Sequence, residues 1–153
     1  MSKANFELEQ SVIGMGIRKV AQVVNYDDLT DGLGTDGDIT LTKQIPAGAF
    51  VIGTKVTVVT GFTGDDTAVM TVGKSAGADE YTDGTSVNVL AAGKVGDSAE
   101  DPNEYNAAAQ SVYCRITGNA DFTSITAGRL FVEVFYLSTE PELENNVPNK
   151  NLI

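Results

Sequence analysis

Apolar and polar residues alternate with a period of two along much of the chain, and helical periodicity is nearly absent. The alternation predicts seven strands, at residues 17–25, 38–45, 50–60, 67–72, 86–91, 111–117 and 129–138. An eighth strand is expected either near residues 105–109 or within the first 16 residues. Short strands separated by turns rich in Gly and Asp are typical of a β-sandwich or barrel. The sequence therefore predicts an all-β, antiparallel sandwich.

The strand patterns also predict which side chains face the core. In the third strand one face contains Phe50, Ile52, Val56 and Val58, with Thr54 interrupting the apolar row. The last strand has one face with Leu130, Val132, Val134 and Tyr136 and another with Phe131, Glu133, Phe135 and Leu137. Because both of its faces are largely apolar, this strand is expected to be covered on both sides. Cys114 shares a face with Val112 and Ile116 and is expected to be a buried, unreactive thiol.

The chain divides into three regions. Residues 17–138 are predicted to form the sandwich, residues 1–16 an N-terminal arm with Gly14 and Gly16 as hinges, and residues 139–153 a tail. Within the sandwich, residues 26–37 are expected to be a turn, and residues 118–128 a long turn anchored by Phe122 and Ile125. Residues 92–106 are acidic and are expected to be irregular.

Composition excludes several kinds of site. The 153 residues contain no His, no Trp and one Cys, so a Ser-His-Asp triad, an imidazole metal site and an intrachain disulfide are impossible. Asp and Glu number 21 against 10 Lys and Arg, a formal net charge of -11. Such a chain is repelled by nucleic acid and by anionic lipid. We expect a soluble, non-enzymatic protein with no signal peptide and no membrane-spanning segment, because the start is acidic and the apolar runs are short.

Clusters of Asp are the only candidates for a metal site. The weak candidates for Ca²⁺ are Asp36, Asp38, Asp65 and Asp66. Their spacing does not match an EF-hand loop, and Asp is common in turns for local reasons, so no metal and no cofactor is expected. Gly14-Met15-Gly16 lacks the third glycine of a dinucleotide fingerprint, because Lys19 stands in its place.

Aromatic residues in the predicted loops are candidate contacts with a partner. Phe62, Tyr81 and Tyr105 lie in such loops, where they either anchor a partner or pack against their own loops. The sequence therefore indicates a contact surface in place of an active site.

Several runs in the middle of the chain resemble small structural proteins of tailed bacteriophages. These runs are Ile45-Pro46-Ala47-Gly48-Ala49-Phe50-Val51-Ile52-Gly53-Thr54-Lys55-Val56, Thr71-Val72-Gly73, Asp83-Gly84-Thr85-Ser86-Val87-Asn88-Val89 and Asp121-Phe122-Thr123-Ser124-Ile125-Thr126-Ala127-Gly128-Arg129-Leu130. The residue pattern of these runs and their turn sequences are similar to those of capsid decoration (cement) proteins of β-sandwich or jelly-roll type. Strand periodicity does not choose between a jelly roll and an immunoglobulin-like sandwich, and the resemblance favours the jelly roll.

The resemblance implies a structural role in the virion. Such proteins sit, commonly as homotrimers, on the outer surface of the capsid and stabilise it by bridging major capsid subunits; this one would be made in the host cytoplasm. Arms and long loops usually make the attachment, which here implicates residues 1–16, 26–37 and 92–106. The residues expected to contact the capsid are Phe6, Leu8, Ile13, Met15, Tyr26, Leu29, Leu33 and Tyr105. The alternatives are a head spike that binds host-surface glycans and a tail-associated module.

Overall fold

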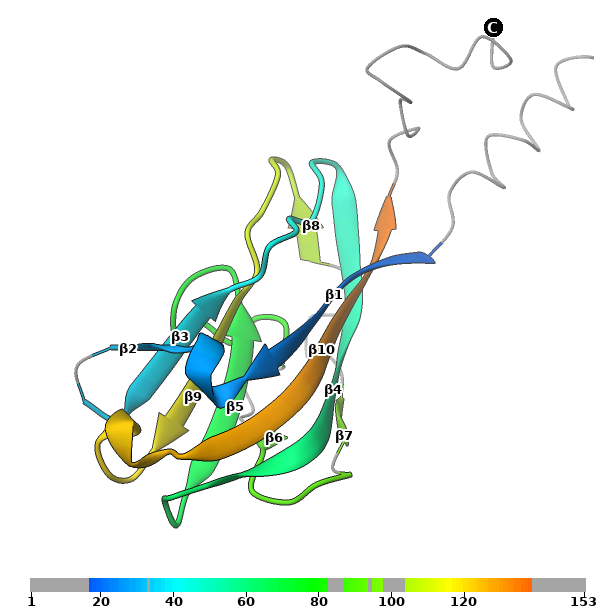
Figure 1. The fold of residues 1–153 in the computed structure, drawn as a ribbon. Helices are drawn as coiled ribbons and strands as arrows, with labels where there is room; N and C mark the ends of the chain where they lie inside the picture. Colours follow the sequence, from blue (N-terminus) through cyan, green and yellow to red (C-terminus); the bar gives the residue numbers. More distant parts are fainter. Residues whose placement is uncertain (1–16, 33, 83–86, 94, 98–103, 139–153) are drawn as a thin grey trace, which may run out of the picture.

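The computed structural model describes residues 17–32, 34–82, 87–93, 95–97 and 104–138, which form two antiparallel sheets stacked as a sandwich (Figure 1). Sheet A has the order β1-β10-β4-β7, and β8 also pairs with β4. Its strands are β1 (Ile17–Asn25), β10 (Ala127–Ser138), β4 (Ala49–Thr63), β7 (Val95–Asp97) and β8 (Glu104–Asn106). Sheet B has the order β2-β3-β9-β5-β6. Its strands are β2 (Thr30–Asp31), β3 (Asp36–Thr40), β9 (Tyr113–Gly118), β5 (Ala68–Gly73) and β6 (Val87–Asn88).

This architecture confirms the predicted all-β antiparallel sandwich, while the jelly-roll topology stays a prediction. Two short 3₁₀ helices, η1 (Tyr26–Asp28) and η2 (Phe122–Ser124), lie in the connections after β1 and before β10. The predicted arm (1–16) and tail (139–153) lie outside the described residues. Within the described ranges, no helix has the length and apolar character needed to span a membrane.

The core lies between the two sheets. Its largest fully buried side chains are Tyr81, Phe62, Ile45, Met70, Ile116 and Leu130. Phe62 and Tyr81 therefore pack inward. Of the two alternatives for these aromatic residues, packing within the protein holds and contact with a partner does not. Cys114 is buried as predicted, and burial raises the pKa of its thiol well above the ordinary value. Phe122 and Ile125 are also buried and anchor the 118–128 turn, as the sequence predicted.

An extra residue in β4 reverses the predicted orientation of its first side chains. Phe135 of β10 pairs with Gly53, whereas the next residue, Tyr136, pairs with Val51, so Ile52 is a bulge. Thr54, Val56 and Val58 face the core as predicted, but beyond the bulge it is Val51 that is buried. Phe50 consequently lies on the outer side of sheet A, where its ring centroid is 5.1 Å from that of Tyr105 on β8. The prediction that Phe50 belongs to the core face is wrong for this reason.

Other strand boundaries differ where the strands are very short. The predicted strand at 38–45 is β3, which begins at Asp36 and ends at Thr40, and Ile45 beyond it makes only an isolated bridge to Gln110. The 26–37 turn contains the two-residue strand β2, which pairs with β3. The 92–106 segment, expected to be irregular, contains β7 and β8, which both pair with the edge of β4.

Two glycines in strands allow the backbone to pass close to buried aromatic rings. Gly128 has φ +153°, and a Cβ there would overlap the ring of Phe62. Gly37 lies in β3, and a Cβ there would overlap the ring of Phe122. Any larger residue at these positions would displace a buried ring from the core.

The packing predicts how a charge at two valines of sheet A affects folding. Val134 is 0% exposed, so Val134→Asp would bury an unpaired carboxylate at a cost of several kcal/mol out of the roughly 5–15 kcal/mol that stabilise a domain. We expect this variant to be unfolded by circular dichroism. Val59, on the adjacent strand β4, is 53% exposed, so Val59→Asp should change the free energy of unfolding by less than about 1 kcal/mol. Cooperative melting of the Val134 variant at the wild-type temperature would contradict the inward orientation of β10.

Candidate functional site: the outer face of sheet A

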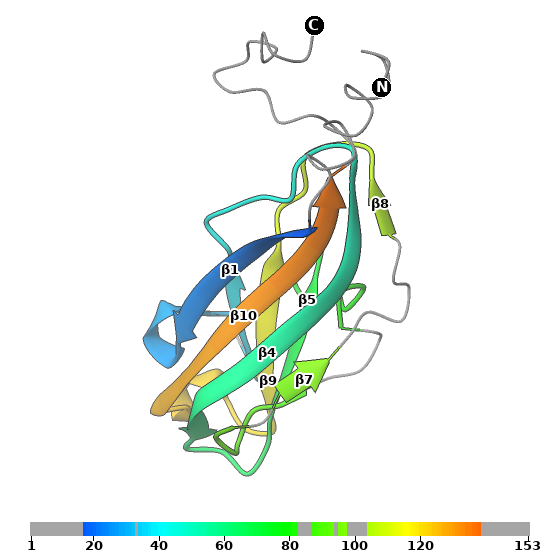
Figure 2. The same ribbon diagram turned by 90° about the vertical axis from the view of Figure 1, so that its right-hand side faces the viewer.

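Figure 2 shows β1, β10 and β4 side by side in front of sheet B, with the outer side of sheet A towards the viewer. Residues opposite each other on adjacent antiparallel strands project to the same side, so the register groups the outward side chains into rows. These rows are Ile17, Leu137, Phe50 and Tyr105; then Lys19, Phe135 and Gly53; then Ala21, Glu133 and Lys55; then Val23, Phe131 and Thr57. We call the surface formed by these rows, together with Val59, the outer face of sheet A.

Most of the large hydrophobic residues that are exposed in the described chain lie on this face. The large hydrophobic residues that are exposed are Ile17 (67%), Tyr105 (53%), Val59 (53%), Val23 (38%) and Tyr26 (37%). Four of them lie on β1, β4 and β8 of sheet A, and the fifth, Tyr26, directly follows β1. No strand of sheet B has an exposed large hydrophobic residue among those described. Exposed apolar side chains gathered on one face are typical of a surface that contacts another macromolecule.

A carboxylate lies at the centre of the face between two lysines. Glu133 is only 7% exposed, and its Oε1 is 2.6 Å from the Nζ of Lys19. Its Oε2 is 3.9 Å from the Nζ of Lys55, its cross-strand neighbour on β4. Lys19 also lies over the ring of Phe131, with Nζ 6.0 Å from the ring centroid. Two cations thus face one buried anion, and both lysine side chains remain 49% exposed.

An open groove continues the face at the end where β1 leads into η1. It is lined by Asn25, Tyr26, Asp27, Thr60, Ala127, Gly128 and Arg129. Asn25, Arg129 and Thr60 are register partners on β1, β10 and β4. The groove therefore belongs to the same surface and adds an aromatic ring and a guanidinium group to it.

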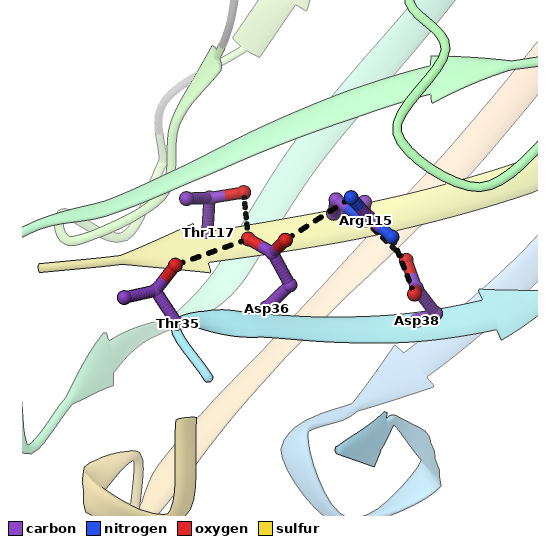
Figure 3. A network of polar contacts seen from close by, with 5 residues as sticks. All are labelled: Thr35, Asp36, Asp38, Arg115 and Thr117. Atoms are coloured by element: carbon purple, nitrogen blue, oxygen red, sulfur yellow. Dashed lines mark hydrogen bonds and ion pairs between the residues drawn. The ribbon is translucent and has the colours of Figure 1, made fainter. Parts of the chain in front are cut away.

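The outer side of sheet B is built differently, around a network of polar contacts (Figure 3). Arg115 of β9 donates to both carboxylate oxygens of Asp38, over 2.7 Å from Nε and 2.8 Å from Nη2. Its Nη1 lies 3.0 Å from Oδ2 of Asp36, whose Oδ1 accepts from the hydroxyl of Thr117 over 2.8 Å. The hydrogen bond to Asp38 and the charges of both carboxylates raise the pKa of Arg115. On this side of the sandwich, Asp36, Asp38, Arg115 and Thr117 are paired with one another.

Three of the four predicted calcium candidates, Asp36, Asp38 and Asp65, have other partners. Asp36 and Asp38 bind Arg115, a contact that places a cation where a metal ion was considered. Asp65 accepts hydrogen bonds from the backbone N–H groups of Asn119 (2.7 Å), Ala120 (2.8 Å) and Thr67 (3.2 Å). These bonds, that from Ala120 foremost, lower the pKa of Asp65. In the described part of the chain, no three His, Cys, Asp or Glu residues are grouped so as to hold a metal ion.

The predicted capsid contacts fall into three groups. Tyr105 lies on the outer face of sheet A, and Tyr26 lines the groove at its end. Leu29 is 8% exposed and belongs to the core, so its side chain does not form part of the surface. Phe6, Leu8, Ile13, Met15 and Leu33 lie outside the described residues. The sequence did not single out Lys19, Lys55 and Val59 of this face, although the apolar residues on both sides of β10 were a signal for it.

Comparison with protein-family models and with curated proteins gives no match. The fold, however, is similar to chains in two solved structures. One, described as the capsid asymmetric unit of cyanophage Pam1, matches with a TM-score of 0.54 and 16% identity over 80% of this chain and 85% of that chain. The other, described as the capsid of Ralstonia phage GP4, matches with a TM-score of 0.56 and 16% identity over 80% of this chain and 84% of that chain. At this identity the similarity is one of fold.

The hydrogen bonds of Asp65 predict a pH-dependent stability. Because the pKa of Asp65 is lowered from 3.8 in the folded state, its carboxylate stabilises the fold above that pH. This contribution is lost as the pH falls through the lower folded-state value. Asp65→Asn should therefore be less stable than wild type in urea at pH 7, and the difference should narrow between pH 4 and pH 2. Asp66→Asn is the control, since it removes the same charge one residue away; an Asp65→Asn difference that stays constant with pH would contradict the assignment.

Proposed function

We propose that this protein is a structural component of a bacteriophage virion that binds the outside of the capsid and bridges major capsid subunits. The observation that carries the proposal is the outer face of sheet A, an exposed apolar surface on a chain whose net charge is -11. A highly charged, soluble chain keeps such a surface only where a partner covers it. The resemblance of its turn sequences to decoration proteins and the fold shared with chains of two phage capsid structures support the capsid as that partner.

The proposed role is mechanical. A chain of 153 residues offers a small footprint, and a stable protein interface buries about 1,600 Å² in total. We propose a homotrimer, because three linked copies engage several shell subunits at once and raise the effective concentration of each weak contact. Bridging neighbouring subunits in this way resists the outward pressure of packaged DNA.

Co-sedimentation with undecorated capsids of its own phage tests the proposal. We expect binding to saturate at a fixed ratio of copies per major capsid subunit, and the decorated shells to survive a higher temperature than bare shells. The reason is that every symmetry-equivalent site offers the same contact. Binding of only a few copies per particle would favour the spike or tail-associated alternative. Absence of binding would overturn the proposal.

The contribution of residues 1–16 is tested by deleting them. The described sandwich begins at Ile17, so the truncated protein should keep the cooperative unfolding of the full chain. Its binding to capsids should be weaker, because an arm adds a second attachment to that of the sandwich. Equal affinity of the truncated and the full chain would show that the arm makes no attachment.

A further inference from the structure

Charged residues are distributed unequally between the two sheets. The three long strands β1, β4 and β10 contain Arg18, Lys19, Lys55, Arg129 and Glu133. The short strands β7 and β8 at the far edge of sheet A add Asp97 and Glu104. The strands of sheet B contain Asp31, Asp36, Asp38 and Arg115. The strands of sheet A thus contain four cations and three anions, whereas those of sheet B contain one cation and three anions.

Both lysines beside Glu133 are partly open to solvent, with 49% of each side chain exposed. Glu133 is buried between the two lysines, so an approaching group meets the partly exposed side chains of Lys19 and Lys55 before the carboxylate. The Nζ of Lys55 is 3.9 Å from the carboxylate, a longer contact than that of Lys19, and the register partner of Lys55 on β7 is Asp97. Around these charges lie the exposed side chains of Val23, Val59 and Tyr105. The chemistry that complements this surface is apolar side chains combined with carboxylates.

A second copy of the chain does not complement the face. A two-fold contact centred on the Lys19–Glu133–Lys55 cluster would bring the lysines of one copy against those of the other, and like charges in an interface are unfavourable. The acidic outer side of sheet B has the opposite charge, but the two sheets lie back to back. Stacking the outer face of sheet A on the outer side of sheet B would therefore repeat without closing and produce an open fibre.

We propose that the outer face of sheet A is the surface that docks on the capsid, and that it binds a patch of the shell protein in which carboxylates are set among apolar side chains. The inference rests on the proposed function and adds the docking surface and the chemistry of the partner. Shell carboxylates pair with Lys19 and Lys55, while shell apolar groups cover Val59 and Tyr105. The outer side of sheet B, whose charged groups Asp36, Asp38 and Arg115 are paired with one another, then faces the solvent.

Charge variants in the capsid co-sedimentation assay test the pairing. Lys55→Glu reverses an interfacial charge and should weaken binding by about tenfold or more at low salt. Lys55→Gln only removes the charge and should weaken binding by less. The wild-type affinity should fall as salt rises, and the salt dependence should be smaller for Lys55→Gln. Lys43→Glu makes the same change of charge at an exposed position in the connection between β3 and β4, and should bind as wild type does.

Polar replacements test the apolar part. Val59 and Tyr105 are both 53% exposed, so the double change Val59→Ser with Tyr105→Ser should leave the melting temperature nearly unchanged. It should weaken capsid binding by about tenfold or more, since apolar and aromatic side chains dominate the binding energy of interfaces. Tyr113→Ser, on the outer side of sheet B, is the matched control and should not affect binding.

The outcomes separate this inference from the proposed function. Wild-type binding that the Lys55 and Val59–Tyr105 variants leave unchanged would overturn the docking surface while keeping the role on the capsid. Loss of binding by Lys43→Glu or Tyr113→Ser, with the sheet A variants unaffected, would assign docking to another side. Wild-type protein that ignores capsids but floats with vesicles of phosphatidylserine and phosphatidylcholine would overturn both, and would assign the face to a membrane surface.

Discussion

The register of β10 between β1 and β4 determines which side chains enter the core, and the ion pairs of Glu133 favour this register. Both sides of β10 are apolar, with Leu130, Val132 and Val134 inside and Phe131 and Phe135 outside. Shifting a strand by one residue exchanges its two faces, and apolar residues alone would oppose such a shift only weakly here. A shifted β10 would place the Glu133 carboxylate in the core without a cation, which costs several kcal/mol. The contacts with Lys19 and Lys55 exist only in the observed register.

Sheet B obtains its register from a different contact. The guanidinium of Arg115 joins Asp36 and Asp38, which lie two residues apart and therefore on one side of β3. A bidentate contact of this kind has directional requirements that a lysine contact lacks. In both sheets, then, a charged cluster on the outer side fixes the pairing of strands whose inner sides are similar apolar rows.

The sequence predicted the long strands well because their alternation extends over many residues. The bounds of β1, residues 17–25, agree with the structure, and β10 begins only two residues before the predicted start. The strands β2, β7 and β8 contain two or three residues, too few for a period to be visible. The bulge at Ile52 could not be predicted either, because counting by two assumes a constant register, and this assumption placed Phe50 on the wrong side.

The surface was less predictable than the core, because its partners are distant in sequence. Arg115 and Asp38 are 77 residues apart, so the sequence showed an acidic cluster without its cation and left Asp36 and Asp38 as weak calcium candidates. Lys19 and Glu133 are 114 residues apart, and only the pairing of β1 with β10 brings them together. Periodicity identified the apolar outer side of β10 but could not reveal that cations border it. These cations, Lys19 and Lys55, belong to the neighbouring strands β1 and β4.

The unequal faces of the sandwich also bear on the particle as a whole. A copy docked through the outer face of sheet A would cover Lys19 and Lys55 and leave the acidic strands of sheet B towards the solvent. The solvent-exposed surface of a densely decorated shell would then have a more negative balance of charges than the surface of the free protein, because Lys19 and Lys55 would be covered. Like-charge repulsion between such layers acts over about 8 Å at physiological salt and keeps particles apart at short range. The same distribution of charge thus favours attraction to the shell on one side and repulsion between particles on the other.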